Sequence, residues 1–334
     1  KGLQDAYRLH TEGADIVIDA QDLDGLRNGI YGLLTDHLDC HWFTPGDLGE
    51  EIGIPADRAV RIPAISEVRG SRWTSASGSI RNRAMVNRGR ANFGHAWYSY
   101  VNAQEYPYEK FPEYYARDRS GKLRKRDTGH TFTNFCSTNP EVIAIVAKKV
   151  NAFFDKNPEA IVASLDPNDY APMCLCDRCL ALDKKYGQMK EDGTQVADRV
   201  LHFSKEIYDR LEPRFKNRYL GILVYGFQMD PPISAKGHPH HMGMICDMFW
   251  TYDHSRPWTD PSSPRNEIFR QQLKAWGSAL SQLGYYEYIG NADFFGPWGL
   301  VYKIREDLPA FRAVGGTFLQ PEVQTLYATQ GLNH

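Results

Sequence analysis

The pattern of hydrophobic and polar positions predicts strand, helix and strand in turn at the start of the chain. Residues 14–20 alternate in character and are rich in β-branched side chains, which predicts a strand. Residues 22–38 carry leucine and isoleucine at helical spacing, and Asp22 can cap the start of that helix. Residues 40–53 predict a short aromatic strand broken by a Pro-Gly turn. We therefore expect a small α/β domain over residues 1–62.

From residue 63 onward, strand-like and helix-like segments alternate over roughly 270 residues. Eight segments have the composition of strands: 67–77, 91–101, 131–138, 160–166, 219–227, 241–250, 285–291 and 316–323. Clear helical patterns lie between the later ones, at 139–157, 194–215, 265–284 and 300–315. This alternation predicts an α/β protein with a (β/α)8 TIM-like barrel over residues 63–334, truncated at its C-terminal end if the native chain continues. A doubly wound open sheet is the structural alternative, although no glycine-rich nucleotide-binding motif supports it.

Carboxylates follow several of these predicted strands. In such barrels the catalytic residues lie at the carboxyl ends of strands and in the loops that follow. Paired carboxylates at that position are typical of glycoside hydrolases, in which one acts as an acid and the other as a nucleophile or base. The candidate catalytic residues are Asp166, Asp169, Asp247 and Glu287. Asp166 and Asp169 could instead only cap a turn, and a carboxylate inside the tyrosine-rich strand of Glu287 needs buried partners.

Aromatic side chains are abundant, at 13% of the chain, and suit either a large core or a sugar-binding surface. Eight further residues near the predicted strand ends are candidates for binding substrate: Arg81, His95, Trp97, Asn168, Tyr225, Trp250, Tyr288 and Glu322. Arg81 belongs to a basic segment that could grip an anionic sugar, or could form a solvated helix face.

Six cysteines occur, and three of them form a C-x-C-x-x-C pattern at Cys174, Cys176 and Cys179. Cys136 ends the neighbouring predicted strand, so the four can form a structural zinc site or two disulfides, or remain free thiols. Cys40 and Cys246 lie in apolar contexts and are expected to be buried and free.

Three histidines, His238, His240 and His241, lie close together in a Pro/Gly-rich stretch before a predicted strand. Histidines this close in sequence could bind a metal ion, although an exposed loop is the expectation for such a stretch.

The bulk charge excludes some classes of partner. The formal net charge is −2, which argues against a general nucleic-acid or membrane-surface binder. No apolar run reaches the roughly 20 residues that span a bilayer. The sequence carries no prediction of the oligomeric state.

Several segments resemble known families. "GIYGLLTDHLDCHWFTPGDLGEEI" resembles the small domain that precedes the barrel in β-hexosaminidases and α-glucuronidases. "FPEYYARDRSGK", "FCSTNPEV" and "SLDPNDYAPMCLCDRC" resemble an uncharacterised bacterial family of glycosidase-like barrels, a domain of unknown function. The resemblance implies a secreted or periplasmic protein whose signal peptide has been removed.

The same resemblance bears on the catalytic residues. Substrate-assisted hexosaminidases carry an Asp-Glu pair after strand four, where this chain has Asn168-Asp169. In α-glucuronidases the acid follows strand four and the base carboxylates come from strands six and seven. Asp169 (or Asp166), Asp247 and Glu287 hold comparable positions.

These observations predict an exo-acting glycoside hydrolase for a bacterial, plant or algal glycan, with an anionic or N-acetylated sugar among the substrates considered. The chemistry is expected to need no cofactor, and any zinc would be structural. A non-catalytic carbohydrate-binding barrel is the alternative, followed by a zinc-dependent hydrolase.

Overall fold

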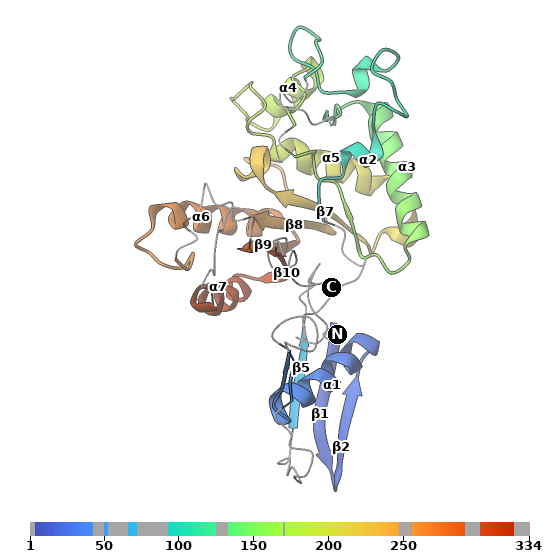
Figure 1. The fold of residues 1–334 in the computed structure, drawn as a ribbon. Coiled ribbons are helices and arrows are strands. Elements are labelled where there is room, and N and C mark those ends of the chain that lie inside the picture. Colours follow the sequence, from blue (N-terminus) through green and yellow to red (C-terminus); the bar gives the residue numbers. More distant parts are fainter. Residues whose placement is uncertain are drawn as a thin grey trace. The chain divides into compact units, whose positions relative to one another are not determined.

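The computed structural model describes residues 4–42, 50–52, 66–71, 93–124, 133–169, 171–246, 253, 256–290 and 301–323. The chain forms two compact units, one made of residues 1–88, 287–298 and 318–334, the other of residues 89–286 and 299–317 (Figure 1). A domain boundary at residue 62 stays a prediction.

The first unit contains an antiparallel sheet and one helix. Its strands are β1 (Gln4–Glu12), β2 (Asp15–Ala20) and β5 (Ser66–Ser71), in the order β2-β1-β5. Helix α1 (Leu23–His37) begins where predicted, because the side chain of Asp22 accepts a hydrogen bond from Gly25 N at 2.7 Å. A two-stranded sheet pairs β3 (Cys40–Trp42) with β4 (Glu50–Ile52).

Two strands of this unit differ from the prediction. Strand β1 was not predicted from the sequence, because few of its residues are apolar and buried: Tyr7 and Leu9 pack against Ile16, Ile18 and Leu33. Strand β5 lies in the segment expected to open the barrel, but it pairs antiparallel with β1. Its polar, glycine-containing sequence suits an edge strand better than a buried barrel strand.

The second sheet is mainly parallel and contains β6 (Val162–Ser164), β7 (Tyr219–Val224), β8 (His241–Cys246), β9 (Gln282–Gly290) and β10 (Gly316–Val323). The strand order is β10-β9-β8-β7-β6, and the pairs from β6 to β9 are parallel (Figure 1). All five strands coincide largely with segments predicted as barrel strands. An α/β fold with a parallel sheet is therefore confirmed.

The same unit contains the helices α2 (Trp97–Tyr100), α3 (Pro140–Lys156), α4 (Asp177–Lys185), α5 (Ala197–Asp209), α6 (Pro264–Ala279) and α7 (Val301–Ala313). Helices α3, α5, α6 and α7 follow the predicted pattern, whereas α2 lies in a segment expected to be a strand and α4 was not predicted. Short 3-10 turns occur at Pro112–Tyr114, Pro213–Phe215 and Gly226–Gln228. The side chains of Asn139 and Ser263 cap α3 and α6, each followed directly by a proline.

The strands expected at 91–101 and 131–138 are much shorter than predicted. In the first segment a single parallel bridge pairs His95 with Asp166, and the chain then turns into α2. In the second, Phe135 bridges to Tyr115 in antiparallel fashion. The bridge at His95 places this residue beside the end of β6, where the site described below forms.

The side chain of Asp198, at the start of α5, binds the backbone of a loop that is distant in sequence, at residues 233–235. Its fully buried carboxylate accepts hydrogen bonds from the backbone N–H groups of Ile233, Ser234 and Ala235, at 2.8, 2.9 and 2.6 Å. Gln188 Nε2 donates to the same carboxylate at 3.1 Å. This buried ion is therefore stabilised by four N–H donors.

The histidine stretch before β8 is not an exposed loop. His238 and His241 are buried, and their rings stack at a centroid distance of 5.0 Å. Ser204 Oγ lies 3.1 Å from His238 Nε2, and the Tyr208 ring stacks on His238. Burial lowers the pKa of His241 to about 3 and that of His238 to about 2, so both rings are neutral at pH 7.

Candidate functional site

The loop after β6 places a buried carboxylate beside a histidine. Asp166 is fully buried, and its Oδ1 accepts hydrogen bonds from Leu223 N at 2.9 Å and from Gln228 Nε2 at 3.1 Å. Its Oδ2 lies 2.8 Å from Nδ1 of His95. Asp166 therefore has protein groups on both oxygens.

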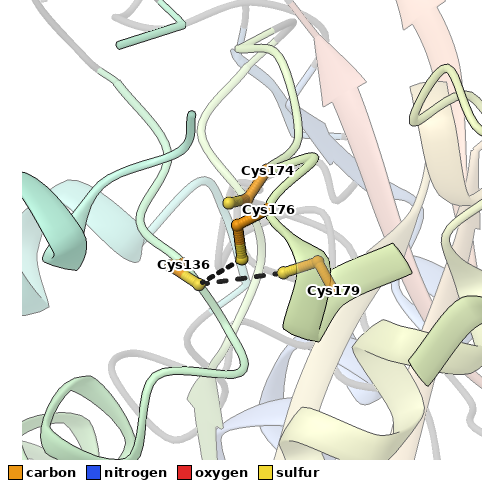
Figure 2. A group of neighbouring side chains, drawn as sticks. All are labelled: Cys136, Cys174, Cys176 and Cys179. Atoms are coloured by element: carbon orange, nitrogen blue, oxygen red, sulfur yellow. Dashed lines mark hydrogen bonds between the residues drawn. The ribbon is translucent and has the colours of Figure 1, made fainter. Parts of the chain in front are cut away.

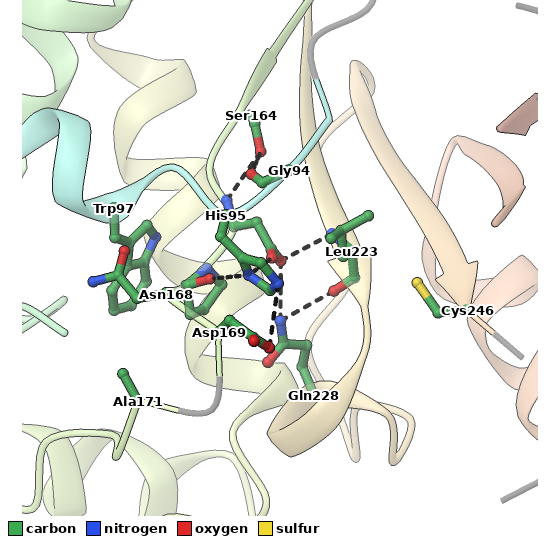
Figure 3. A network of polar contacts seen from close by, with 12 residues as sticks. Gly94, His95, Trp97, Ser164, Asn168, Asp169, Ala171, Leu223, Gln228 and Cys246 are labelled. Atoms are coloured by element: carbon green, nitrogen blue, oxygen red, sulfur yellow. Dashed lines mark hydrogen bonds and ion pairs between the residues drawn. The ribbon is translucent and has the colours of Figure 1, made fainter. Parts of the chain in front are cut away.

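The other edge of the His95 ring faces a more exposed carboxylate. His95 Nε2 lies 3.4 Å from Oδ1 of Asp169, whose side chain is 43% exposed (Figure 3). The ring of Tyr225, the first residue after β7, lies 5.7 Å from that of His95. The three groups Asp166, His95 and Asp169 thus form a chain that runs from the core of the protein toward its surface.

The charge on this chain follows from its surroundings. Burial alone would lower the pKa of His95, but the hydrogen bond and negative charge of Asp166 outweigh it and raise the pKa from 6.5 to about 8. Burial also raises the pKa of Asp166, although the bond with His95 opposes that shift. His95 is therefore mainly an imidazolium at neutral pH, and its Nε2 forms an ion pair with Asp169 Oδ1.

This pairing predicts a pH-dependent stability. Because the folded pKa of His95 exceeds its unfolded value, the pairing stabilises the fold fully below pH 6.5, and this contribution is lost as pH rises through 8. The loss is about 2 kcal/mol. We expect the difference in unfolding free energy between the wild type and a His95→Gln variant to shrink by this amount between pH 6 and pH 9. Urea titrations measure it, and a pH-independent difference would contradict the assignment.

A set of amide hydrogen bonds holds the Asp169 loop in place. Asn168 N donates to Asn134 Oδ1 at 2.9 Å, and Asn134 Nδ2 donates to Ala171 O at 2.8 Å. The Asn168 side chain donates to Thr133 O at 3.1 Å and accepts from Tyr98 N at 2.8 Å. Asn168, predicted to bind substrate, is buried and uses its amide to brace the loop.

Trp97, predicted at a sugar subsite, is a core residue instead. It is fully buried, its ring stacks on Phe135 at 4.0 Å, and Nε1 donates to Leu165 O at 2.7 Å. The short helix α2 turns the tryptophan into the core. His95 and Tyr225, by contrast, remain partly exposed at the carboxyl ends of strands.

Of the other predicted site residues, the structure describes the side chains of Glu287 and Tyr288. Glu287 and Tyr288 are buried in β9, directly after the last residue that pairs with β8. Glu322 belongs to β10, and its side chain lies outside the described residues. Arg81, Asp247 and Trp250 also lie outside them.

The sequence analysis did not identify Gln228 or Ser164 as parts of this site. Gln228 Nε2 donates hydrogen bonds to Asp166 Oδ1 and to Leu223 O. Ser164 Oγ donates to Gly94 O at 2.6 Å (Figure 3). Gln228 follows β7 within four residues, so the strand-end rule could have selected it.

The four clustered cysteines meet near this loop, as predicted. Cys136, Cys174, Cys176 and Cys179 place their sulfur atoms within 4.8 Å of one another (Figure 2). The structure joins none of the four through a disulfide, and the same holds for the buried Cys40 and Cys246. Among the described residues this is the one group whose ligand atoms cluster as a metal site requires.

Among the described residues, none of the helices has the length and apolar character needed to cross a bilayer.

The chain belongs to the family described as Domain of unknown function (DUF4838), whose model matches residues 57–323. Its predicted membership of an uncharacterised family is thereby confirmed. No curated protein matches the sequence.

Two solved structures of glycoside hydrolases are similar to this chain at low sequence identity. A β-N-acetylhexosaminidase from Bacteroides fragilis is 13% identical with a TM-score of 0.50, and the match covers 96% of this chain and 71% of that one. This likeness identifies a glycoside-hydrolase-like fold. A family 89 glycoside hydrolase from Clostridium perfringens is 11% identical with a TM-score of 0.49, covering 96% of this chain. The present chain spans 43% of the length of that enzyme.

Proposed function

We propose that this protein is an exo-acting glycoside hydrolase whose acid/base residue is Asp169. The observation that carries the proposal is the chain of Asp166, His95 and Asp169 at the carboxyl end of β6. Catalytic groups of barrel enzymes lie at this end of the strands. Of the two predicted aspartates, only Asp169 combines exposure with a proton-bearing neighbour, whereas Asp166 is engaged by Leu223 and Gln228.

In this mechanism each member of the chain has one task. Asp166 holds the Nδ1 edge of His95 and keeps the ring charged. His95 forms an ion pair with Asp169 through Nε2, and it acts as the proton reservoir and positioning partner of that carboxylate. Asp169 protonates the glycosidic oxygen as the bond to the departing group breaks, and later accepts a proton from water.

A second carboxylate must act at the anomeric carbon. The candidates for this role from the sequence are Asp247, which follows β8, and Glu287, which belongs to β9. The first carboxylate then donates the proton while the second attacks or activates water. Tyr225, beside His95 and partly exposed, offers an aromatic face for a sugar ring.

The alternative is a carbohydrate-binding barrel without turnover, and one experiment separates the two. The purified full chain is incubated with nitrophenyl glycosides of neutral, N-acetylated and uronic sugars, and with sulfated oligosaccharides. The N-acetylated sugars are included because the Bacteroides fragilis neighbour is a β-N-acetylhexosaminidase. We expect nitrophenol release from at least one glycoside. Calorimetric binding of an oligosaccharide with no released product from any substrate would establish the binding protein instead.

A further inference from the structure

We propose that Cys136, Cys174, Cys176 and Cys179 bind one structural zinc ion that fixes the loop carrying Asp169. The proposal concerns a metal site, and only its consequence for the loop rests on the proposed function. The four ligands come from two segments: Cys136 precedes α3, and the other three surround the start of α4.

The distances between the sulfur atoms fit a tetrahedral ion. Zinc–thiolate bonds are about 2.3 Å long, so the sulfur atoms of a regular tetrahedral site lie about 3.8 Å apart. Cys136 Sγ lies 3.7 Å from both Cys176 Sγ and Cys179 Sγ (Figure 2). Cys174 completes the group, with all four sulfur atoms within 4.8 Å. Side chains that surround a common centre at this spacing match a closed zinc site made of four cysteines.

A pair of disulfides fits this arrangement less well. A disulfide brings two sulfur atoms to about 2.0 Å and leaves the remaining pair separate. Here Cys136 is equally distant from Cys176 and Cys179, so the geometry selects neither as a bonded partner. A shared ion explains why one sulfur atom faces several others at the same distance.

Hydrogen-bonding groups and the start of a helix surround the sulfur atoms. Arg117 N donates to Cys174 Sγ at 3.4 Å, and Thr138 Oγ1 lies 3.2 Å from Cys179 Sγ. Cys176 is the N-cap of α4, where the positive end of the helix dipole lies, and Arg178 belongs to the first turn of that helix. Donors and positive charge of this kind orient and stabilise the ligands of zinc–cysteine sites.

The arrangement is closed, which argues for a structural role. Cys136 and Cys179 are fully buried, and Cys174 is nearly so. With four protein ligands no position remains for water or substrate, so the ion would not take part in hydrolysis. This disfavours the zinc-dependent hydrolase considered from the sequence, at this site.

The zinc ion would act on the loop through the backbone next to its ligands. Cys136 lies two residues after Asn134, whose side chain holds Asn168 N and Ala171 O. Ala171 in turn lies between Asp169 and Cys174. The Asp169 loop is therefore connected to the four sulfur atoms on both sides, through the Asn134 hydrogen bonds next to Cys136 and through the chain that leads from Ala171 to Cys174.

Metal analysis of the wild type tests the site directly. The full chain is purified in reducing buffer without added metal, and its zinc and iron are measured by elemental mass spectrometry. We expect one zinc ion per chain. Replacing it by Co²⁺ is expected to give the thiolate-to-cobalt charge-transfer bands and strong visible bands of a tetrahedral sulfur site.

Variants place the ion on the named cysteines. Cys176→Ser, at the least buried ligand, is expected to lose most of the zinc, and Cys176→His is expected to retain it with an altered cobalt spectrum. Cys40→Ser is the matched control, because Cys40 is also a buried free thiol but belongs to the N-terminal unit, and it should keep the full zinc content. Full zinc content in Cys176→Ser together with Cys179→Ser would overturn the assignment.

Other outcomes in the wild type also contradict the proposal. Iron in place of zinc, two disulfides found by mapping of unreduced protein, or four free thiols without metal would each overturn it. These results do not depend on turnover, so a protein that holds zinc but hydrolyses no glycoside would refute the proposed function and leave the zinc site standing.

Discussion

Replacing Asp169 by Ala is expected to lower kcat/KM by about 100-fold to 10,000-fold on a glycoside with a poorly acidic leaving group. The loss reflects the missing proton for the departing oxygen. On the matching dinitrophenyl glycoside the loss should be far smaller, since that leaving group departs without protonation. The contrast between the two substrates identifies Asp169 as the acid rather than as a residue that only binds sugar.

Asp155→Ala is the control for this measurement. Asp155 lies on α3 shortly before β6 begins, so it is at the opposite end of that strand from Asp169, and its side chain is 58% exposed. Its activity should match the wild type on both substrates. Equal losses for Asp169→Ala on the good and the poor leaving group would remove the acid role from Asp169.

Replacing Asp198 by Ala is expected to lower the free energy of unfolding by about 3–4 kcal/mol. The change leaves the N–H groups of residues 233–235 and the Gln188 amide without their acceptor. The donors of Ala235 and Gln188 are buried, and each buried donor left unsatisfied costs about 1–3 kcal/mol. Such a loss is a large part of the roughly 5–15 kcal/mol that stabilises a typical domain.

Urea unfolding followed by circular dichroism measures this loss. Asp209→Ala, at the other end of α5, is the matched control, because that carboxylate is half exposed and pairs only with Lys205 among the partners the structure describes. Exposed helix pairs of this kind contribute little, so its stability should stay close to that of the wild type. An equally small loss of unfolding free energy in Asp198→Ala would mean that other acceptors replace the carboxylate for the N–H groups of the loop.

Local pattern was enough to predict much of the fold. The helical spacing and Asp22 cap of α1, and the apolar runs that form β6 to β9, depend on residues near in sequence. The pairing of β5 with β1 does not depend on residues near in sequence, because the partner of a strand is set by which sheet edge is available. β1 was missed for a related reason, since its pattern shows few apolar positions.

The candidate site could be located from the sequence, but its roles could not be assigned. The strand-end rule placed Asp166, Asp169, His95 and Tyr225 together. Which aspartate turns inward depends on hydrogen bonds from Leu223 and Gln228, and those residues follow Asp166 by more than fifty positions. Trp97 shows the same limit: α2 directs it into the core, although its neighbour His95 stays at the surface.

The cysteine cluster also has a topological consequence. Cys136 and Cys174 bracket residues 137–173, which contain α3, β6 and the loop with Asp169. A metal ion on these thiols closes that stretch into a ring and restricts the unfolded chain. Helix, strand and loop would then open as one cooperative unit in hydrogen exchange, so metal loss would loosen the candidate catalytic loop before the rest of the sheet.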